Sequence, residues 1–283
     1  MQIITYTARG PNPAHRPCRF HLMERMIAEV ISSRELIWRL FWRDFLARYR
    51  QSALGVAWII LQPLFLVGLF VAMNQAGIFQ TTGLDLPYVP YALAGLALWQ
   101  IFSGGVSSCS LALIEAGHLI AKINLPRSAL VFAAFGQATA EFLVRLAITA
   151  MACLWYGLIP DGFSFILAAM ATLPLCLLAL GSGFVLAIAA ALFRDVINAT
   201  TMALSGLLLL TPVLYPLKAD SLLAKLNALN PLNYLINVPR DLALHGHSTD
   251  LSAYAISVGF ALLVFLMGWR LFFIAQPHIS ERI

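Results

Sequence analysis

The sequence predicts an all-α integral membrane protein with six transmembrane helices, an N-terminal amphipathic interfacial helix, and short re-entrant helices before the last span. Hydrophobic residues make up 60% of the 283 positions and charged residues only 11%, whereas soluble domains carry roughly 25% charged residues. The chain also contains apolar stretches long enough to cross a bilayer core, which takes about 20 residues. These stretches cover residues 53–73, 89–112, 128–157, 164–192, 198–216 and 251–273.

The chain before the first apolar stretch divides into two parts. Residues 1–33 hold three early prolines among scattered charges, which is typical of a mobile or loosely docked arm. This arm has no apolar core of the length that a cleavable signal peptide needs. Residues 34–52 follow as the interfacial helix, and the membrane domain at 53–273 and a tail at 274–283 complete the predicted organisation.

Residues 34–52 mix aromatic and basic side chains. At 100° per residue, the rings gather within an arc of about 100°. They belong to Trp38, Phe41, Trp42, Phe45 and Tyr49, and the side chains of Arg39, Arg43 and Arg50 lie well away from them. Such a helix lies in the plane of the membrane interface, with its rings at the boundary of headgroups and acyl chains. Asp44 and Arg48 stand one turn apart and can form an ion pair.

Basic residues predict the topology. Nine of the 18 Lys and Arg residues precede residue 53, and others lie in the 113–127 loop, the 193–198 turn and the tail. Because Lys and Arg beside membrane spans are retained in the cytoplasm, both termini are expected on the cytoplasmic side. The same asymmetry argues against a nucleic-acid partner and for membrane lipids, since the charge is concentrated next to predicted spans.

Prolines interrupt the fifth apolar stretch. Pro212 and Pro216 each remove a backbone donor and clash with the preceding turn, so the helix is expected to break or kink there. The following 217–250 segment is long for a simple hairpin and contains an apolar patch at 229–238. This pattern predicts short helices that dip back into the membrane.

Two ionisable residues fall inside the third apolar stretch. Glu141 and Arg145 are one turn apart, in a region where charged groups are costly and face protein or water. We expect a mutual ion pair, with a structural role favoured over a substrate-binding one.

Two kinds of chemistry lack a motif in this sequence. Cys109, Cys153 and Cys176 fall inside apolar runs without CxxC or Cys/His spacing, so neither a metal site nor a disulfide is expected. The pattern GxxxxGK[ST], which cradles nucleotide phosphates, does not occur. We therefore expect that the chain does not hydrolyse ATP by that route, and any uphill transport would need a separate ATPase or an ion gradient.

Four segments carry motifs in a characteristic order. The first is the approach to the membrane, with Arg43-Asp44, Arg48-Tyr49, Leu54-Gly55, Trp58 and Pro63. EAGHLIAKINLPR at 115–127 follows the second apolar stretch, LFRDV at 192–196 follows the fourth, and NPLNYLINVPRDL at 230–242 precedes the last. Together these motifs resemble permease subunits of ABC-2 type transporters over nearly the whole chain from residue 34 on. More narrowly, they resemble the branch that exports lipid-linked O-antigen, capsular polysaccharide or teichoic acid.

The resemblance implies a multi-pass protein of the bacterial inner membrane that acts as a homodimer with two ATP-binding subunits. ATP and Mg²⁺ would bind in those subunits, and this chain would hold no cofactor. The lipid-linked glycan would pass along the seam between the two permeases, after entering from the lipid beside the interfacial helix. Arginines at headgroup depth would then pair with its pyrophosphate by charge-assisted hydrogen bonds. These are Arg39, Arg43, Arg48 and Arg50.

Three sets of site residues follow from this interpretation. Rings on which sugars slide are expected at Tyr88, Tyr91, Trp99, Tyr215 and Tyr234. Contacts with the ATPase are expected at Glu115, His118, Lys122, Arg127, Arg194 and Asp195. An outer gate segment is expected around Asn230, Pro231 and Arg240.

Simpler interpretations remain open for some of these residues. Arg194 and Asp195 can serve only to close a turn and hold the topology. Asn230 and Pro231 can serve only to start a helix, and Arg240-Asp241 can be a solvated surface pair of little energetic consequence.

Three other functions remain open for the whole chain. The first is an ABC-2 permease for a drug or a lipid. The second is an integral membrane transferase, which would need clustered polar groups at the interface, although His245 and His247 have only Asp241 and Asp250 near them in the sequence. The third is a structural membrane subunit or a channel.

Overall fold

The computed structural model describes residues 19–50, 55, 57–75, 86–120, 125–158, 162–214, 222–248 and 250–279. Within these ranges all regular structure is helical, which confirms the predicted all-α class. In this part of the chain four helices are long and apolar enough to cross a membrane, so the protein is a multi-pass membrane protein. They are α4 (Tyr88–Glu115), α6 (Arg127–Trp155), α7 (Gly162–Leu192) and α11 (Leu251–Ile279).

The predicted count of six spans is not confirmed. The first apolar stretch forms α3 (Ala57–Gln75) and the fifth forms α8 (Asp195–Leu210), which supply only shorter apolar segments. After Leu210 the chain turns extended at Thr211, with φ −84° and ψ 131°, so the helix ends just before Pro212 as predicted. Pro216 lies outside the described residues.

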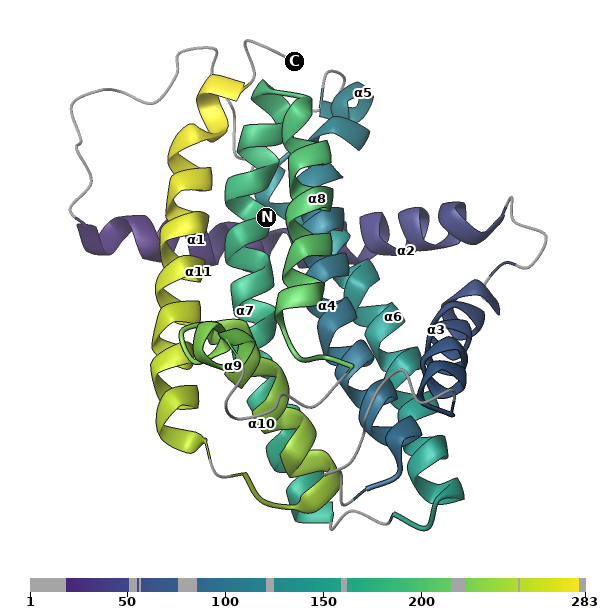
Figure 1. Ribbon diagram of the computed structural model, residues 1–283. Helices are drawn as coiled ribbons and strands as arrows, with labels where there is room; N and C mark the ends of the chain where they lie inside the picture. The colour runs from purple at the N-terminus through teal and green to yellow at the C-terminus, as the bar shows by residue number, and fades with distance from the viewer. Residues whose placement is uncertain are drawn as a thin grey trace, which may run out of the picture.

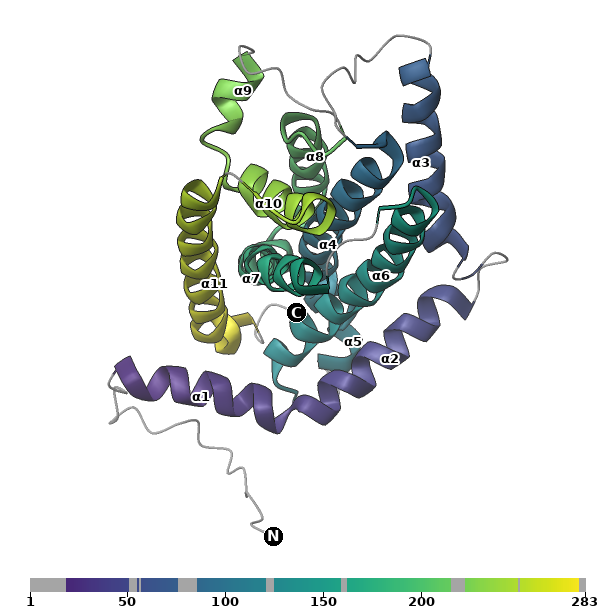
Figure 2. The same ribbon diagram turned by 90° about the horizontal axis from the view of Figure 1, so that it is seen from below.

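Helix α7 lies at the centre of the bundle. It packs against α4, α11 and α10 (Pro231–His245), while α6 packs along α4 (Figures 1 and 2). Phe184 of α7 is fully buried and its ring centroid lies 5.1 Å from that of Phe272 on α11. Helix α5 (Gly117–Ile120) and the turn between α7 and α8 lie at the same end of the bundle (Figure 1). The predicted 113–127 loop and 193–198 turn therefore share one end.

Helices α7 and α11 cross where both carry glycine. A Cβ atom added to Gly181 would lie 2.5 Å from the Cα of Phe265. A Cβ atom added to Gly268 would collide with the backbone carbonyl oxygen of Gly181. Glycine at these positions permits a backbone approach that any other residue would prevent.

The N-terminal region forms two helices that run across the bundle (Figures 1 and 2). Helix α1 (Arg19–Ser32) occupies the second half of the predicted arm, and α2 (Arg34–Arg50) covers the segment 34–52 for which an interfacial helix was predicted. Their inner side buries Met26 and Leu40 in a cluster with Leu113 and Val131. Their outer side exposes large apolar residues at a spacing of four. These are Met23, Ile27 and Ile31 on α1 and Trp38, Trp42 and Leu46 on α2.

Two short helices, α9 (Leu222–Asn227) and α10, occupy the segment before α11. Asn230 begins α10 as its N-cap, and its side chain accepts a hydrogen bond from the backbone N–H of Leu232 at 3.0 Å. Pro231 follows at the first helical position, which its missing N–H suits. Gly246 ends the helix with φ 76°. The short helices are as predicted, but a re-entrant course through the membrane is not confirmed.

Candidate functional site

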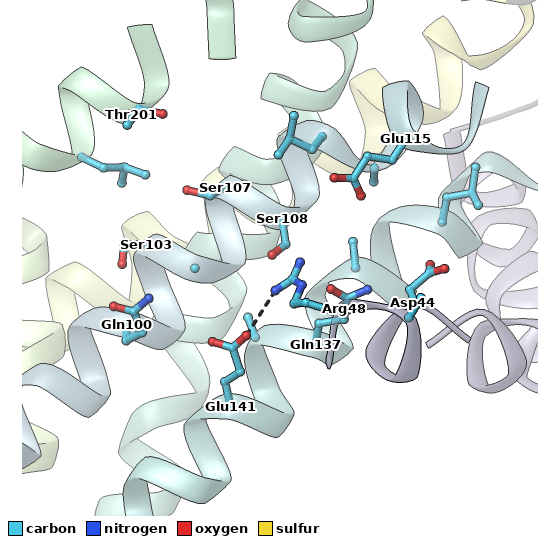
Figure 3. A pocket seen from close by; sticks show the side chains of 18 of the residues that line it. Asp44, Arg48, Gln100, Ser103, Ser107, Ser108, Glu115, Gln137, Glu141 and Thr201 are labelled. Carbon is cyan, nitrogen blue, oxygen red and sulfur yellow. Dashed lines mark hydrogen bonds and ion pairs between the residues drawn. The ribbon is translucent and has the colours of Figure 1, made fainter. Parts of the chain in front are cut away.

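A polar cavity of about 800 Å³ opens between α2, α4, α6 and α8, with Gln62 of α3 and His118 of α5 at its margin (Figure 3). We call it the polar cavity. Its lining is rich in hydroxyl and amide groups, which is unusual among membrane-crossing helices because unpaired polar groups are costly in lipid. The hydroxyl and amide side chains are those of Gln62, Gln100, Ser103, Ser107, Ser108, Gln137, Thr201 and Ser205.

Helix α4 supplies the longest polar wall of this cavity. Gln100, Ser103, Ser107 and Glu115 line it, and these positions follow one helical face (Figure 3). This wall was not predicted from the sequence. The sequence did contain a signal for a polar helical face, because these polar residues recur at intervals of three, four and eight residues within an otherwise apolar helix.

The facing wall is formed by α8. Thr201 and Ser205 are exposed and line the cavity one turn apart. Each hydroxyl donates to the carbonyl oxygen one turn earlier, Thr201 Oγ1 to Ile197 at 3.0 Å and Ser205 Oγ to Thr201 at 2.9 Å. Each hydroxyl oxygen still has acceptor capacity for a ligand.

An ion-pair network joins α2 to α6 at the cavity. Arg48 Nη1 lies 3.2 Å from Glu141 Oε1 (Figure 3). Arg145 Nη1 lies 3.3 Å from Glu141 Oε2. The structure thus contains the Glu141–Arg145 pair within one helix, and Arg48 joins it. The pair expected between Asp44 and Arg48 is wrong, because Arg48 turns to α6 and Asp44 accepts from Arg43 Nε at 2.7 Å.

Glu141 is expected to contribute to stability because it is the shared partner of two arginines. The Arg145 side chain is only 6% exposed, so the change Glu141→Gln leaves a buried guanidinium without its counter-charge. We expect Glu141→Gln to lower the free energy of unfolding by about 1–2 kcal/mol, measured by thermal unfolding in detergent. Glu35→Gln is the matched control, since the Glu35–Arg39 pair is exposed and should contribute less than about 0.5 kcal/mol. Equal effects of the two changes would contradict this role.

Charges at the polar cavity nearly balance. The lining carries three carboxylates, from Asp44, Glu115 and Glu141, against the guanidinium groups of Arg43 and Arg48. A cavity that selected a highly charged anion would carry an excess of basic groups. Balanced charge with many hydroxyls suits a neutral, hydroxyl-rich ligand.

The predicted headgroup arginines are only partly brought together. Arg43 and Arg48 both line the polar cavity. Arg39 is exposed and paired with Glu35 at 2.5 Å on the same helix. Arg50 ends α2, and its side chain lies outside the described part of the structure.

The predicted aromatic residues do not form one rim. Trp99 lines the polar cavity but is only 4% exposed. Tyr91 is buried, and the Tyr88 hydroxyl donates to the backbone carbonyl of Leu214 at 2.8 Å. Tyr234 of α10 donates to the carbonyl of Ala228, in the turn between α9 and α10, at 3.1 Å. Tyr215 lies outside the described residues.

Arg240 is a buried residue that ties α10 to α4 and to the end of α8. It is 4% exposed, and its guanidinium stands 3.9 Å above the ring centroid of Tyr91. Nη1 donates to the carbonyl oxygens of Pro212 and Val213 at 3.5 and 3.3 Å, and Nη2 to Asn237 Oδ1 at 2.7 Å. The interpretation of Arg240–Asp241 as a solvated surface pair is therefore wrong.

Burial also raises the pKa of Asp241, and the neighbouring Arg240 guanidinium opposes that rise.

Other side chains bind the same irregular segment after α8. Asn227 Nδ2 donates to the carbonyl of Leu210 at 2.5 Å, and Asn230 Nδ2 to Thr211 Oγ1 at 3.1 Å. Leu210 is the last residue of α8, so Asn227 satisfies one carbonyl that the helix end leaves without a partner. Arg240 and Tyr88 bind carbonyls of the irregular segment that follows, and Asn230 binds the Thr211 side chain. We call these four side chains the α8 clamp. Asn230 and Arg240 of the predicted outer gate segment both belong to it.

The residues predicted to meet an ATPase lie toward one end of the bundle. Glu115 ends α4, and His118 follows in α5, where both are exposed and line the mouth of the polar cavity. Arg194 and Asp195 are exposed at the turn before α8. Arg127 begins α6 but is buried, and it donates to the backbone carbonyl of Gln276 on α11. Lys122 lies outside the described residues.

Within the described ranges, no group of three or more His, Cys, Asp or Glu side chains is arranged to hold a metal ion. The His245 and His247 rings lie 6.0 Å apart between centroids, at the exposed end of α10.

Comparison with known proteins places this architecture in a family. The chain is 27% identical to the O-antigen export system permease protein RfbA of Myxococcus xanthus over 214 residues, which cover 74% of this chain and 80% of that protein. It is 24% identical to the protein of the same name from Klebsiella pneumoniae over 214 residues, covering 72% and 78%. A family model described as ABC-2 type transporter matches residues 35–243, which is most of the chain and includes the polar cavity and the α8 clamp. The protein is therefore a member of the ABC-2 type transporter family.

Proposed function

We propose that this protein is the permease subunit of an ABC transporter that exports a lipid-linked polysaccharide, such as O-antigen, across the bacterial inner membrane. Membership of the ABC-2 family implies a separate ATP-binding subunit, in which ATP and Mg²⁺ would bind. The permease itself is then a transport subunit and not an enzyme. Two relatives named O-antigen export system permease support the choice of cargo.

The observation that carries this proposal is the lining of the polar cavity. Sugar polymers present hydroxyl groups at their edges and apolar C–H surfaces on their faces. The cavity offers hydroxyls and amides from α4, α6 and α8, and nearly balanced charge. A drug or a simple lipid would instead call for a predominantly apolar site.

The passage is completed, in this proposal, by a second copy of the chain. Helices α3 and α8 flank the polar cavity and expose large apolar side chains, with Phe65 75%, Met202 80% and Leu209 74% exposed. Two such copies facing one another would close the open side of the cavity. The polymer would then pass along the seam, with α9 and α10 returning part-way into the bilayer on the outer side.

The direction of transport rests on the proposed cytoplasmic position of both termini and of the α5 end of the bundle. Glu115, His118, Arg194 and Asp195 would there meet the ATP-binding subunit. The lipid end of the cargo would enter beside α2, where Arg43 and Arg48 would exchange their partners Asp44 and Glu141 for a pyrophosphate.

Narrowing the polar cavity should slow export. Thr201→Trp places a large ring in the cavity from an exposed position on α8, so we expect the rate of polymer export to fall by about tenfold or more. The measurement is ATP-driven delivery of a lipid-linked glycan into vesicles that hold this chain and its ATP-binding subunit.

The matched control is Met170→Trp on α7, which adds the same ring at a residue that is 60% exposed and outside the cavity. It should export at the rate of the unaltered protein. Export that persists in the Thr201 variant, or that proceeds without the ATP-binding subunit, would refute the proposed function.

A further inference from the structure

Helices α4, α6, α7 and α10 come together at the end of the bundle opposite α5 (Figure 1). Their residues line a second cavity of about 490 Å³. We call it the apolar groove. Its floor includes the buried side chains of Leu98 and Ile101 on α4. Its mouth lies between α6 and α7, where Leu143, Leu154 and Leu173 are 59%, 65% and 58% exposed. Because α6 and α7 are membrane-crossing helices, this mouth faces the hydrocarbon of the bilayer.

The groove has no hydroxyl donor left for a water, and it offers only scattered hydroxyl acceptors in a lining that is otherwise mostly apolar. Its three hydroxyl groups each donate to the carbonyl one turn earlier on the same helix. Thr139 binds Phe135 at 3.1 Å, Thr149 binds Arg145 at 2.9 Å and Thr172 binds Ala168 at 2.9 Å. The two terminal nitrogens of Arg240, which borders the groove, are already bonded to backbone and to Asn237. A buried water typically needs about three polar partners, so hydrocarbon is the better filling.

We propose that the apolar groove binds one acyl chain of a bilayer phospholipid. A dry cavity of about 150 Å³ is known to hold one benzene ring, so 490 Å³ corresponds to roughly 20 carbon atoms. That is the size of a single acyl chain, whereas the polyprenyl tail of a glycan carrier is several times larger. The groove is also at the far end of the bundle from α5. It is thus a site for a resident lipid, separate from the polar cavity and independent of what the protein exports.

The bound chain would support the α8 clamp. Pro239 and Arg240 border the groove from α10, so hydrocarbon packed beneath them fills space that would otherwise leave α10 without contacts on that side. A bound chain would thereby contact the helix whose Arg240 binds the segment after α8.

The test uses the full chain in phosphatidylethanolamine vesicles that contain a small fraction of phosphatidylethanolamine with a diazirine in one acyl chain. After illumination, cross-linked residues are mapped by mass spectrometry. We expect labels to be concentrated on groove residues of α6 and α7 over Met151 and Met170, which are exposed outside the groove. Even labelling of all exposed apolar residues would overturn the proposal.

Filling the groove gives an independent measurement. Ala150 and Ala169 are exposed residues that line the groove. The double variant Ala150→Phe, Ala169→Phe should reduce labelling of the groove by about tenfold or more. Excluding two methylene groups of the acyl chain from the groove already weakens its binding by about that factor. Ala147→Phe, on the same helix but outside the groove, should leave labelling unchanged. Labelling that survives filling, or stronger labelling by a diazirine-bearing polyprenyl phosphate, would reject a phospholipid chain as the occupant. Neither readout requires export or ATP hydrolysis.

Discussion

Replacing Arg240 by leucine is expected to lower the free energy of unfolding by about 3–5 kcal/mol, and the Tm in detergent by about 10 °C. The guanidinium is 4% exposed and binds the carbonyl oxygens of Pro212 and Val213, the amide oxygen of Asn237 and the face of Tyr91. Leucine can replace none of these hydrogen bonds, so three buried acceptors lose a donor. Asp241 also loses its nearest positive charge, 3.9 Å away.

Two further variants test whether geometry or charge matters. Arg240→Lys keeps the charge, but a single ammonium group cannot replace the planar guanidinium, which donates to acceptors on two sides. The Tm of the lysine variant should therefore fall between those of the leucine variant and the unaltered protein. Arg270→Leu removes an exposed arginine from α11 and should change stability by less than about 0.5 kcal/mol. An Arg240→Leu variant as stable as the Arg270→Leu variant would show that the α8 clamp contributes nothing to stability.

Hydropathy predicted the positions of the long helices closely. The stretches at 89–112 and 128–157 became α4 (Tyr88–Glu115) and α6 (Arg127–Trp155), because a membrane span needs a continuous apolar run that is visible in one dimension. Helix capping also depends on only a few neighbouring residues, so it could be predicted from the sequence. Asn230 and Pro231 start α10, as expected for an N-cap asparagine followed by proline. Helix α1 was not predicted, since three nearby prolines dominated the composition of the arm and hid the apolar spacing of Met23, Ile27 and Ile31.

The functional surfaces were harder to predict because they depend on helix packing. Arg48 and Glu141 are 93 residues apart, and only the crossing of α2 over α6 brings them together. The serines of α4 could not be assigned to a site from the sequence, because the polar cavity exists only where Gln137 and Thr201 from two other helices line it with them. Arg240 was assigned to an outer gate by resemblance, but its burial under the end of α8 depends on the break at Thr211 and on the ring of Tyr91.

Alanine at Gly181 is expected to destabilise the protein by about 2–3 kcal/mol, and leucine by more. The added Cβ would lie 2.5 Å from the Cα of Phe265 and 2.6 Å from its backbone nitrogen, so α11 itself must move away from α7. Backbone atoms cannot yield by changing a rotamer, and the displaced helix would also lose the contact between Phe184 and Phe272. Gly268→Ala should have a similar effect, since its Cβ would collide with the carbonyl of Gly181.

A second glycine on α11, the helix that carries Gly268, separates this packing effect from the effect of helix propensity. Gly259 of α11 has nothing within 4 Å of its added Cβ, so Gly259→Ala should stabilise the protein by about 0.5–1 kcal/mol through the higher helix propensity of alanine. The two substitutions are chemically identical but should shift Tm in opposite directions. Because Gly181 and Gly268 form one contact, the double alanine variant should cost less than the sum of the single changes. Additive costs, or a Tm increase for Gly181→Ala, would mean that α7 and α11 do not cross in close backbone contact.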